Sequence, residues 1–199
     1  MRPDRVRPTA TFVALMFVAL PGLIGWQILQ AQGGTPASPA TRAARIERGA
    51  YLVKTSACTD CHTPLKMGPR GPEPDQARAL SGHPQDLVMP PAPALPPGPW
   101  AGVMSATSTA WAGPWGVSFT ANLTPDPDTG LGRWTEDMFL TALRTGRHEG
   151  KGRPILPPMP AAVYAQMTDE DLRSIFAYLQ SVAPIRNQVP QPIDPVEAN

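Results

Sequence analysis

Hydrophobic residues recur at helical spacing in three stretches of the chain. The apolar positions are Ile46, Ala50 and Val53 in the first stretch, Phe139, Leu140 and Leu143 in the second, and Leu172, Ile175, Phe176 and Leu179 in the third. Thr135 and Thr168 stand where N-cap residues are expected, while Gly146 and Pro184 stand where the second and third patterns stop. The pattern therefore predicts one helix over residues 42–56 and two capped helices further along the chain.

A fourth hydrophobic stretch, residues 11–29, has no polar face and is preceded by three arginines. It is long enough to cross a bilayer as a helix, which takes about 17 to 25 apolar residues. The arginines predict that the N-terminus stays in the cytoplasm and that the rest is exported. We therefore expect residues 1–30 to anchor the chain in the cell inner membrane, with the following domain on the periplasmic side. A cleavable signal sequence ending near residues 31–33, which would leave a soluble periplasmic protein, is the alternative.

Prolines and small residues separate these stretches, and the chain has 27 prolines in 199 residues. Residues 31–41 contain no hydrophobic side chain larger than alanine and predict a flexible tether. Residues 188–199 are rich in proline and polar residues and predict a tail that wraps the surface. The intervening residues 42–187 form the predicted domain.

The longest irregular segment, residues 63–116, interrupts that domain between the first two predicted helices. Its run from Met89 to Trp100 is rich in proline and predicts an extended polyproline-II conformation. Solvated linkers contain few aromatic residues, yet this segment also carries Trp111 and Trp115. We expect a strap that lies over the core with the three tryptophans as pins, and a docking surface for a partner domain is the alternative.

The balance of charge argues against a nucleic-acid partner. The chain has 17 basic and 16 acidic residues, and its formal net charge is +1. Three of the basic residues and one of the acidic residues precede residue 31, which leaves 14 against 15 in the rest of the chain. Phosphate binding needs a clear basic excess, so we expect no nucleic-acid partner.

The two cysteines of the chain lie three positions apart, and a histidine follows the second: Cys58-Thr59-Asp60-Cys61-His62. This spacing is the attachment signature of c-type haem. Two thiols across a tight turn reach the two vinyl groups of one porphyrin, and the turn places the His62 imidazole under the iron. The sequence therefore predicts one haem c, held covalently through Cys58 and Cys61, with His62 as a metal ligand. The strap over residues 63–116 is then expected to lie over the haem edge as well as the core.

Two other interpretations of a Cys-x-x-Cys pair fit less well. A thioredoxin-like redox pair requires a strand–helix–strand context, which the pattern around residues 51–64 does not have. A zinc site would have to recruit two ligands from His62, His83 and His148, whose spacing matches no common zinc module. The histidine next to the second cysteine favours haem.

Several short segments of the sequence resemble the corresponding segments of one protein family. They are Gly-Ala-Tyr-Leu-Val (49–53), Asn-Leu-Thr-Pro-Asp-Pro-Asp-Thr-Gly (122–130), Arg-Trp-Thr-Glu (133–136), Ala-Leu-Arg-Thr-Gly (142–146), Met-Pro (159–160) before Tyr164, and Thr-Asp-Glu-Asp-Leu (168–172). The order of the helices and the haem motif resembles a class I cytochrome c. Residues 49–187 resemble more closely the cytochrome subunits of membrane-bound bacterial dehydrogenases. Those subunits often carry several haem motifs, whereas this chain carries one.

The resemblance implies an all-α class I cytochrome c fold, with N-terminal, central and C-terminal helices around one haem and a long proline-rich insertion. In that family the first and last helices cross closely, and Gly49 resembles the glycine of this crossing, with Tyr178 as the aromatic residue packed on it. Trp134 resembles an indole that lies near a haem propionate and binds the cofactor. The carbonyl of Pro69 or Pro72 is the expected acceptor for the second nitrogen of the proximal histidine.

The distal iron ligand is expected to be one of eight methionines. Met1, Met16, Met67, Met138 and Met167 are set aside because they precede the domain, lie too close to the haem motif, or belong to a helix or its flank. Of the remaining three, Met159 has prolines on both sides that stiffen its backbone. It also lies just before the C-terminal helix, where class I cytochromes place this ligand. We predict Met159 as the second metal ligand, with Met89 and Met104 as alternatives.

Two functions are compatible with such a site. The first is an electron carrier with His/Met-ligated haem, which passes electrons from a dehydrogenase or another donor complex to an oxidase or another cytochrome. This carrier has no small-molecule substrate and no catalytic residue, although it can be a subunit of an oxidoreductase complex. The second is a haem peroxidase or gas sensor, which needs an open distal site. The methionine loop favours the carrier.

Overall fold

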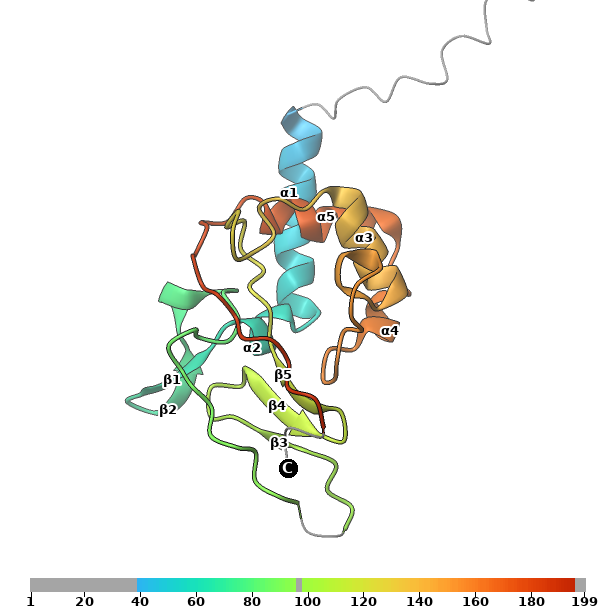
Figure 1. Cartoon of the computed structure of the whole chain (residues 1–199). Coiled ribbons are helices and arrows are strands. Elements are labelled where there is room, and N and C mark those ends of the chain that lie inside the picture. Colours follow the sequence, from blue (N-terminus) through green and yellow to red (C-terminus); the bar gives the residue numbers. More distant parts are fainter. Residues whose placement is uncertain (1–38, 96–97, 196–199) are drawn as a thin grey trace, which may run out of the picture. The chain divides into compact units, whose positions relative to one another are not determined.

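The computed structural model describes residues 39–95 and 98–195 (Figure 1). Its helices are α1 (Pro39–Thr55), α2 (Cys58–His62), α3 (Glu136–Thr145), α4 (Ala161–Tyr164) and α5 (Asp169–Leu179), with 3₁₀ turns η1 (Gln76–Arg78) and η2 (His148–Gly150). Its strands are β1 (Leu65–Gly68), β2 (Gly71–Pro74), β3 (Val103–Met104), β4 (Ala110–Gly113) and β5 (Gly116–Phe119). The three amphipathic helices predicted from the sequence correspond to α1, α3 and α5.

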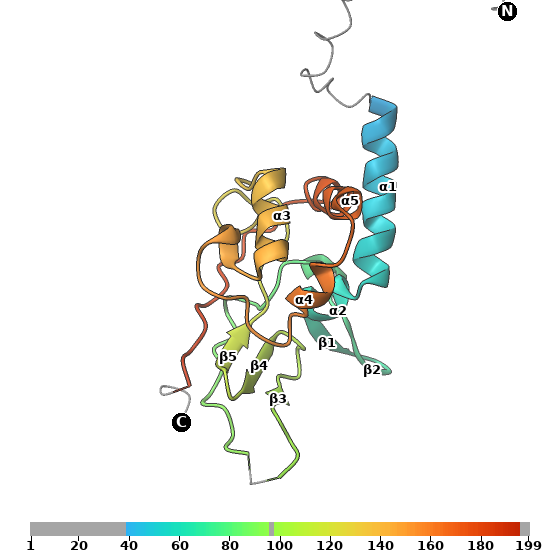
Figure 2. The same ribbon diagram turned by 90° about the vertical axis from the view of Figure 1, so that its right-hand side faces the viewer.

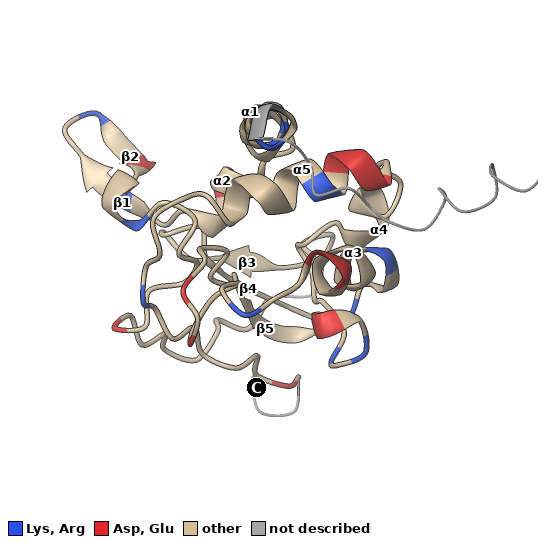
Figure 3. Cartoon of the chain, turned by 90° about the horizontal axis from the view of Figure 1, so that it is seen from above, with Lys and Arg blue, Asp and Glu red and all other residues tan. Residues whose placement is uncertain are grey.

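Helices α1 and α5 cross at close range (Figure 2). Gly49 lies at their point of contact. A Cβ atom at this position would overlap the carbonyl oxygen of Ser174 and would lie 2.7 Å from the Cβ of Tyr178. Ion pairs flank the crossing, between Arg45 and Glu170 (3.2 Å) and between Arg48 and Asp171 (2.9 Å). Figure 3 shows the acidic first turn of α5 that supplies these carboxylates. The predicted place of Gly49 and Tyr178 in the helix crossing is confirmed.

The predicted caps determine where α3 and α5 begin. The Thr135 hydroxyl accepts a hydrogen bond from the backbone N–H of Met138, and the Thr168 hydroxyl accepts one from that of Asp171. Gly146 ends α3 in the left-handed conformation, with φ at 63°. The helices and the loops between them share one core, formed by Leu52, Val53, Leu80, Leu131, Phe139, Leu140, Leu143, Tyr164, Leu172, Ile175, Phe176 and Leu179.

Part of the predicted irregular segment 63–116 forms β-structure. Strands β1 and β2 form an antiparallel hairpin, and β3, β4 and β5 form an antiparallel sheet that extends to Phe119. Strands β4 and β5 contain tryptophan, valine and phenylalanine, which favour β-structure. The turn between them ends at Gly116, whose φ of 87° is readily adopted only by glycine. The all-α prediction is therefore not confirmed, because backbone pairing orders residues whose pattern alone looks irregular.

The tryptophans of this segment differ in their surroundings. Trp100 is 73% exposed, so its predicted role as a pin is wrong. Trp111 and Trp115 are half-buried, as that role requires. A Cβ atom on Gly113 would lie 2.6 Å from the ring of Trp115, which therefore covers β4. The two tryptophans of the β4–β5 hairpin are therefore less exposed than Trp100.

The chain after α5 returns along the loop that connects β5 to α3. The buried side chain of Asn122 donates a hydrogen bond to the carbonyl oxygen of Ile185 over 2.8 Å. Further on, Ile193 in the predicted tail pairs with Val117 of β5 through two backbone hydrogen bonds of 2.8 and 2.9 Å. These contacts hold β5 and the residues directly after it in place.

The predicted membrane anchor, residues 11–29, lies outside the described residues, as does most of the predicted tether 31–41. Helix α1 begins at Pro39, so the last residues of that tether are helical. Within residues 39–95 and 98–195, no helix has the length and apolar character needed to span a membrane.

Candidate haem site

The Cys-x-x-Cys-His segment forms a short helix directly after α1. Ala57 adopts the left-handed conformation (φ 59°, ψ 20°) and turns the chain, so that α2 begins at Cys58. Residues three positions apart lie on the same side of a helix, which places Cys58 and Cys61 together on α2. Both thiols are half-buried and form no disulfide. They are therefore available for two bonds to one planar group.

The surroundings of the two thiols oppose a thioredoxin-like role. Burial raises the pKa of the Cys58 thiol to about 11, although hydrogen bonds act in the opposite direction. Burial also raises the pKa of Cys61, and the neighbouring Asp60 carboxylate adds to this effect. Redox-active cysteine pairs depend on a lowered thiol pKa, because the thiolate is the nucleophile. This turn lacks that property.

The other two histidines have partners of their own. His83 is fully buried, and its ring nitrogens form hydrogen bonds with Thr109 Oγ1 (3.0 Å) and the carbonyl oxygen of Leu87 (2.9 Å). His148 meets the ring of Trp134 edge-on, with 5.3 Å between the ring centroids. Among the described residues, no group of three or more His, Cys, Asp or Glu side chains could hold a metal ion. The zinc interpretation thus receives no support.

His62 is buried at the end of α2, and one hydrogen bond fixes its orientation. Its Nδ1 donates to the carbonyl oxygen of Ala121 over 2.7 Å, and Nε2 has no hydrogen-bond partner in the described part of the chain. Burial lowers the pKa of His62, while the bond to Ala121 opposes that shift, and the net lowering keeps the ring neutral at pH 7. A neutral imidazole oriented through one nitrogen is the form that ligates iron through the other.

The prediction that the carbonyl of Pro69 or Pro72 accepts a hydrogen bond from His62 is wrong. Both prolines are exposed, in or next to the turn of the β1–β2 hairpin. The acceptor belongs instead to Ala121, 59 positions after the histidine, and β5 brings it back to α2. The Ala121 acceptor could not be predicted from the sequence, because every residue has a backbone carbonyl and no side chain marks the one that is used. The only signal was its place directly before the Asn-Leu-Thr-Pro phrase.

Met159 lies in a loop that is tied to the rest of the site at two points. The Ser118 hydroxyl of β5 donates to the carbonyl oxygen of Pro157 over 2.5 Å. The Tyr164 hydroxyl of α4 donates to the carbonyl oxygen of Ser56, just before α2, over 2.5 Å. These bonds fix the methionine loop against the segments that carry and orient the Cys-x-x-Cys-His turn.

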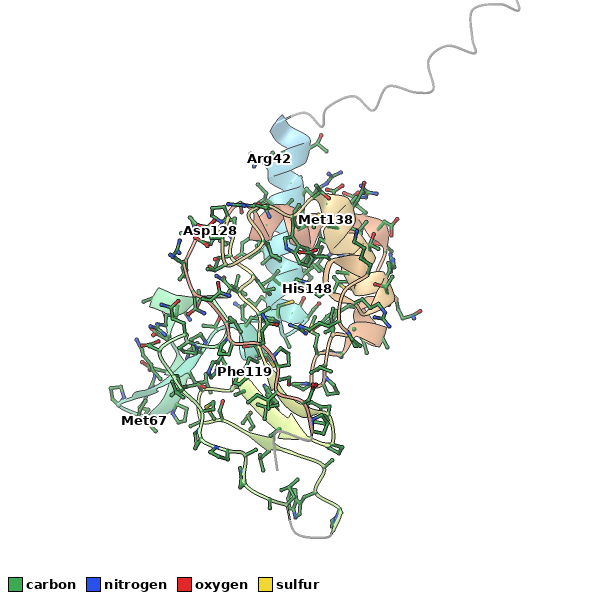
Figure 4. The ribbon with its side chains drawn as sticks, viewed as in Figure 1. Arg42, Met67, Phe119, Asp128, Met138 and His148 are labelled. Carbon is green, nitrogen blue, oxygen red and sulfur yellow. The ribbon has the colours of Figure 1, made fainter. Side chains whose placement is uncertain are left out.

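The other methionines differ from Met159 in their surroundings. Among the described residues, Met159 is the one of the three candidates that packs against the hydrophobic core, which Cys58 also contacts. Met104 is 53% exposed on β3, and its sulfur accepts a hydrogen bond from Ser108 Oγ (3.5 Å). Met89 is half-buried in the proline-rich segment. Figure 4 shows Met67 on the β1–β2 hairpin and Met138 on α3, away from each other.

Trp134 precedes α3 and packs half-buried against the core. Its backbone N–H donates to the carbonyl oxygen of Leu131 over 3.0 Å, which fixes the entry into the helix. Its contact with His148 links it to the turn after α3. Its place near a haem propionate stays a prediction.

The donor set suits a covalently attached haem. Two unbridged thiols on one helical turn, and an imidazole whose Nε2 has no hydrogen-bond partner among the described residues, are groups that can hold c-type haem. Residues 46–183 match the family model of cytochrome c. The chain belongs to the cytochrome c family. Membership supports a class I cytochrome fold, covalently bound haem c and electron transfer through that haem.

Several similar proteins are named as subunits of bacterial dehydrogenases. A subunit of the nicotinate dehydrogenase of Pseudomonas putida is 28% identical over 178 residues, which are 89% of this chain and 12% of that protein. The cytochrome c subunit of alcohol dehydrogenase (quinone) of Gluconobacter oxydans is 29% identical over 171 residues, 82% of this chain and 28% of that protein. The cytochrome c subunit of gluconate 2-dehydrogenase of Pantoea cypripedii is 29% identical over 143 residues, 71% of this chain and 24% of that protein. The chain therefore spans less than a third of the length of each.

Proposed function

We propose that this chain is a single-haem electron carrier on the periplasmic side of the cell inner membrane. Cys58 and Cys61 would hold the haem covalently, and His62 and Met159 would ligate its iron. The observation that carries this proposal is the hydrogen bond from His62 to Ala121 on a turn that also presents two unbridged thiols. Attachment and proximal ligation then come from one helical turn of the chain.

One hydrogen bond fixes the orientation of the His62 ring. The bound haem supplies a one-electron couple between ferric and ferrous iron. Burial keeps the imidazole neutral, and the hydrogen bond to Ala121 fixes its tautomer, so Nε2 would be the nitrogen that ligates the iron. The same bond raises the basicity of the ring as a ligand. Little of the chain then has to move when the charge of the site changes.

Met159 would supply the second iron ligand in this proposal. A thioether favours ferrous iron and raises the reduction potential, which suits acceptance of electrons from a dehydrogenase. The bonds from Ser118 to Pro157 and from Tyr164 to Ser56 hold the loop at both ends. A thioether held in this way would leave no open iron position for peroxide or a diatomic gas. Trp134 lies close to a propionate in the same proposal.

The partners follow from the names of the similar proteins and from the sequence. Three of them are named as dehydrogenase subunits, two of these as cytochrome c subunits, so we propose a dehydrogenase as the electron donor. An oxidase or another cytochrome receives the electron, and no small-molecule substrate is bound. Residues 11–29 attach the chain to the membrane.

The test is a spectrum of the mature protein with the haem count measured beside it. We expect one haem per chain that stays with the polypeptide in acid acetone, and a sulfur-to-iron charge-transfer band in the ferric form. The reduced form should not bind carbon monoxide. Extractable haem, or a reduced form that binds carbon monoxide, contradicts the proposal, and the second outcome favours a peroxidase or gas sensor. Cys61→Ala should sharply reduce the mature protein.

A further inference from the structure

The carbonyl group of Ala121, which orients the His62 ring, lies just after β5, where the chain passes beside α2 (Figure 1). Its position depends on the residue directly before it, Thr120, whose two backbone groups are both hydrogen-bonded. The Thr120 N–H donates to the carbonyl oxygen of Thr109, and the Thr120 carbonyl oxygen accepts from the N–H of His83, each over 2.9 Å. The residues that hold Thr120 therefore also determine where the acceptor for His62 lies.

The short segment Gly82-His83 contacts both this acceptor and the haem turn. The backbone N–H of Gly82 donates to the carbonyl oxygen of His62 over 2.8 Å. Gly82 has a φ of 76°, and a Cβ atom there would lie 2.3 Å from the carbonyl oxygen of Thr120 and 2.6 Å from that of Ala121. The absence of a side chain at this position lets the segment pack directly against the Ala121 carbonyl. The segment thus borders both the backbone of His62 and the group that orients its ring.

The buried side chain of His83 closes a loop of hydrogen bonds. Its Nδ1 lies 3.0 Å from Oγ1 of Thr109, the residue whose carbonyl oxygen accepts from Thr120. Its ring also packs against that of Phe119 at the end of β5, with 4.8 Å between the ring centroids. The loop runs from the His83 ring through Thr109 and Thr120 and back to the His83 backbone. It holds the residue that directly precedes the acceptor for His62.

The hydrogen bonds of the His83 ring have a defined direction. Burial lowers the pKa of His83, so the ring is neutral at pH 7. Its Nε2 lies 2.9 Å from the carbonyl oxygen of Leu87, which can only accept, so Nδ1 accepts from Thr109. Ser105 Oγ accepts from two backbone N–H groups, so its own hydrogen goes to Thr107 Oγ1 over 3.0 Å. Thr107 then donates to Thr109 Oγ1 over 2.7 Å, and this chain of hydroxyls ends at the ring.

We propose that His83 is a positioning residue for the proximal haem ligand. Through the closed loop of hydrogen bonds it holds the Ala121 carbonyl within reach of the His62 ring. A firmly held acceptor raises the basicity of that imidazole as a ligand, which favours the ferric state and lowers the reduction potential. His83 therefore acts on the potential through His62. The inference rests on the proposed function, since it takes His62 as an iron ligand, but it does not require Met159 in that role.

The test compares two replacements of His83 in the mature, full-length protein. His83→Gln keeps a donor for the Leu87 carbonyl and lacks an acceptor for Thr109, whereas His83→Asn keeps that acceptor and lacks the donor. We expect the equilibrium constant for reduction to rise by up to about tenfold in His83→Gln, which is about 59 mV for a one-electron couple. His83→Asn should stay much closer to the unaltered protein. Equal shifts in both variants would show that the link to Thr109 is not the cause, and would overturn the inference.

Thr109→Val tests the same link from its other end. It removes the hydroxyl that donates to the ring and keeps the size of the side chain, so the potential should rise as in His83→Gln. Proton NMR of the reduced protein gives a second readout, because the His62 Nδ1–H should exchange with solvent faster when its acceptor is loosely held. Thr141→Val removes a hydroxyl on the exposed side of α3 and should change neither property.

Two further measurements separate this inference from the proposed function. Haem retention in acid acetone and the ferric absorption spectrum should be the same in all variants, because attachment and ligation are unaltered. Extractable haem in the unaltered protein would refute the proposed function instead. If the His83 and Thr109 variants fail to mature, ¹⁵N NMR of the unaltered reduced protein reports the tautomer of His83, which we expect to be Nε2–H. A hydrogen on Nδ1, or one potential shared by His83→Gln, Thr109→Val and Thr141→Val, overturns the inference.

Discussion

At the scale of single residues, Met159 is the side chain whose chemistry most affects the proposed site. Met159→Ala should leave the haem attached, because the thioethers lie on α2. It should abolish the sulfur-to-iron band, lower the reduction potential and let carbon monoxide bind the reduced iron, since the thioether stabilises the ferrous state. Absorption spectra and a redox titration measure all three changes.

The matched controls for this change are the two other candidate methionines. Met89→Ala and Met104→Ala should keep the band and the potential of the unaltered protein, because neither side chain packs against the core beside Cys58. Loss of the band in either of these variants, with Met159→Ala unaffected, would assign the ligand to the inserted segment instead.

Tyr164 is a residue that links the methionine loop to the turn before α2. Its side chain is buried, and burial raises the pKa of the hydroxyl to about 12, so it is a hydrogen-bond donor throughout the neutral range. Tyr164→Phe removes its bond to Ser56 and should lower the free energy of unfolding by about 1 to 2 kcal/mol. Denaturant unfolding measures the loss. Tyr51→Phe, at a tyrosine that is 57% exposed, should cost much less, and equal costs would contradict a role for the bond.

At the scale of elements, the crossing of α1 and α5 depends on the absence of a side chain at Gly49. Gly49→Ala gains helix propensity of up to about 1 kcal/mol, but its Cβ overlaps the backbone of Ser174. Overpacking costs about 1 to 3 kcal/mol, so we expect a net destabilisation of about 1 to 2 kcal/mol in denaturant unfolding.

Gly68→Ala is the control for the helix crossing. Its Cβ meets only the carboxylate end of the flexible, exposed Glu73 side chain. That side chain can move aside, so the change in the free energy of unfolding should stay within about 0.5 kcal/mol. If both glycine variants lose the same stability, the crossing is not what makes Gly49 necessary.

At the scale of the whole molecule, stability should fall as the pH falls. The hydrogen bond from Arg144 lowers the pKa of Asp169, so this carboxylate binds its proton less readily in the folded state than in the unfolded state. Burial lowers the pKa of His83, so this group also makes the folded state less stable as the pH falls. Both contributions are present above the unfolded pKa values of 6.5 for histidine and 3.8 for aspartate, and are lost below them.

The measurement is the denaturant midpoint of the mature protein over the acid range. We expect a decline that begins as the pH falls below about 6.5 and steepens below about 3.8. Asp169→Asn cannot titrate, so its profile should be flatter in the steeper, more acidic part only. A midpoint that rises on acidification would contradict the sign of both contributions.

The attachment of the whole chain to the membrane is testable in cells. With residues 11–29 as an uncleaved anchor, washing membranes with carbonate should leave the haem-stained protein in the pellet. A protease added to spheroplasts should digest the haem domain, because the positive flank keeps only the N-terminus inside. Release of the protein by carbonate would indicate a cleaved signal, and protection from protease would refute the orientation.

Features that depend on neighbouring residues could be predicted from the sequence alone. The Cys58-to-His62 motif is local covalent spacing, and the family match is in line with the haem c it predicts. The starts of α3 and α5 follow from Thr135 and Thr168, because a cap and its partner lie three residues apart. The assignments of Met159 and Trp134 to the haem are also of this local kind, and they stay predictions.

Features that depend on distant parts of the chain were decided only by the tertiary structure. His62 is oriented by a carbonyl 59 residues away, and no residue type marks a carbonyl. The strands β3 to β5 form because cross-strand pairing and the return of Ile193 order a stretch with no clear period of its own. Trp100 and Trp111 look alike in the sequence, yet the fold exposes one and buries the indole nitrogen of the other. Burial is a property of the assembled chain, and so only the tertiary structure could distinguish these two tryptophans.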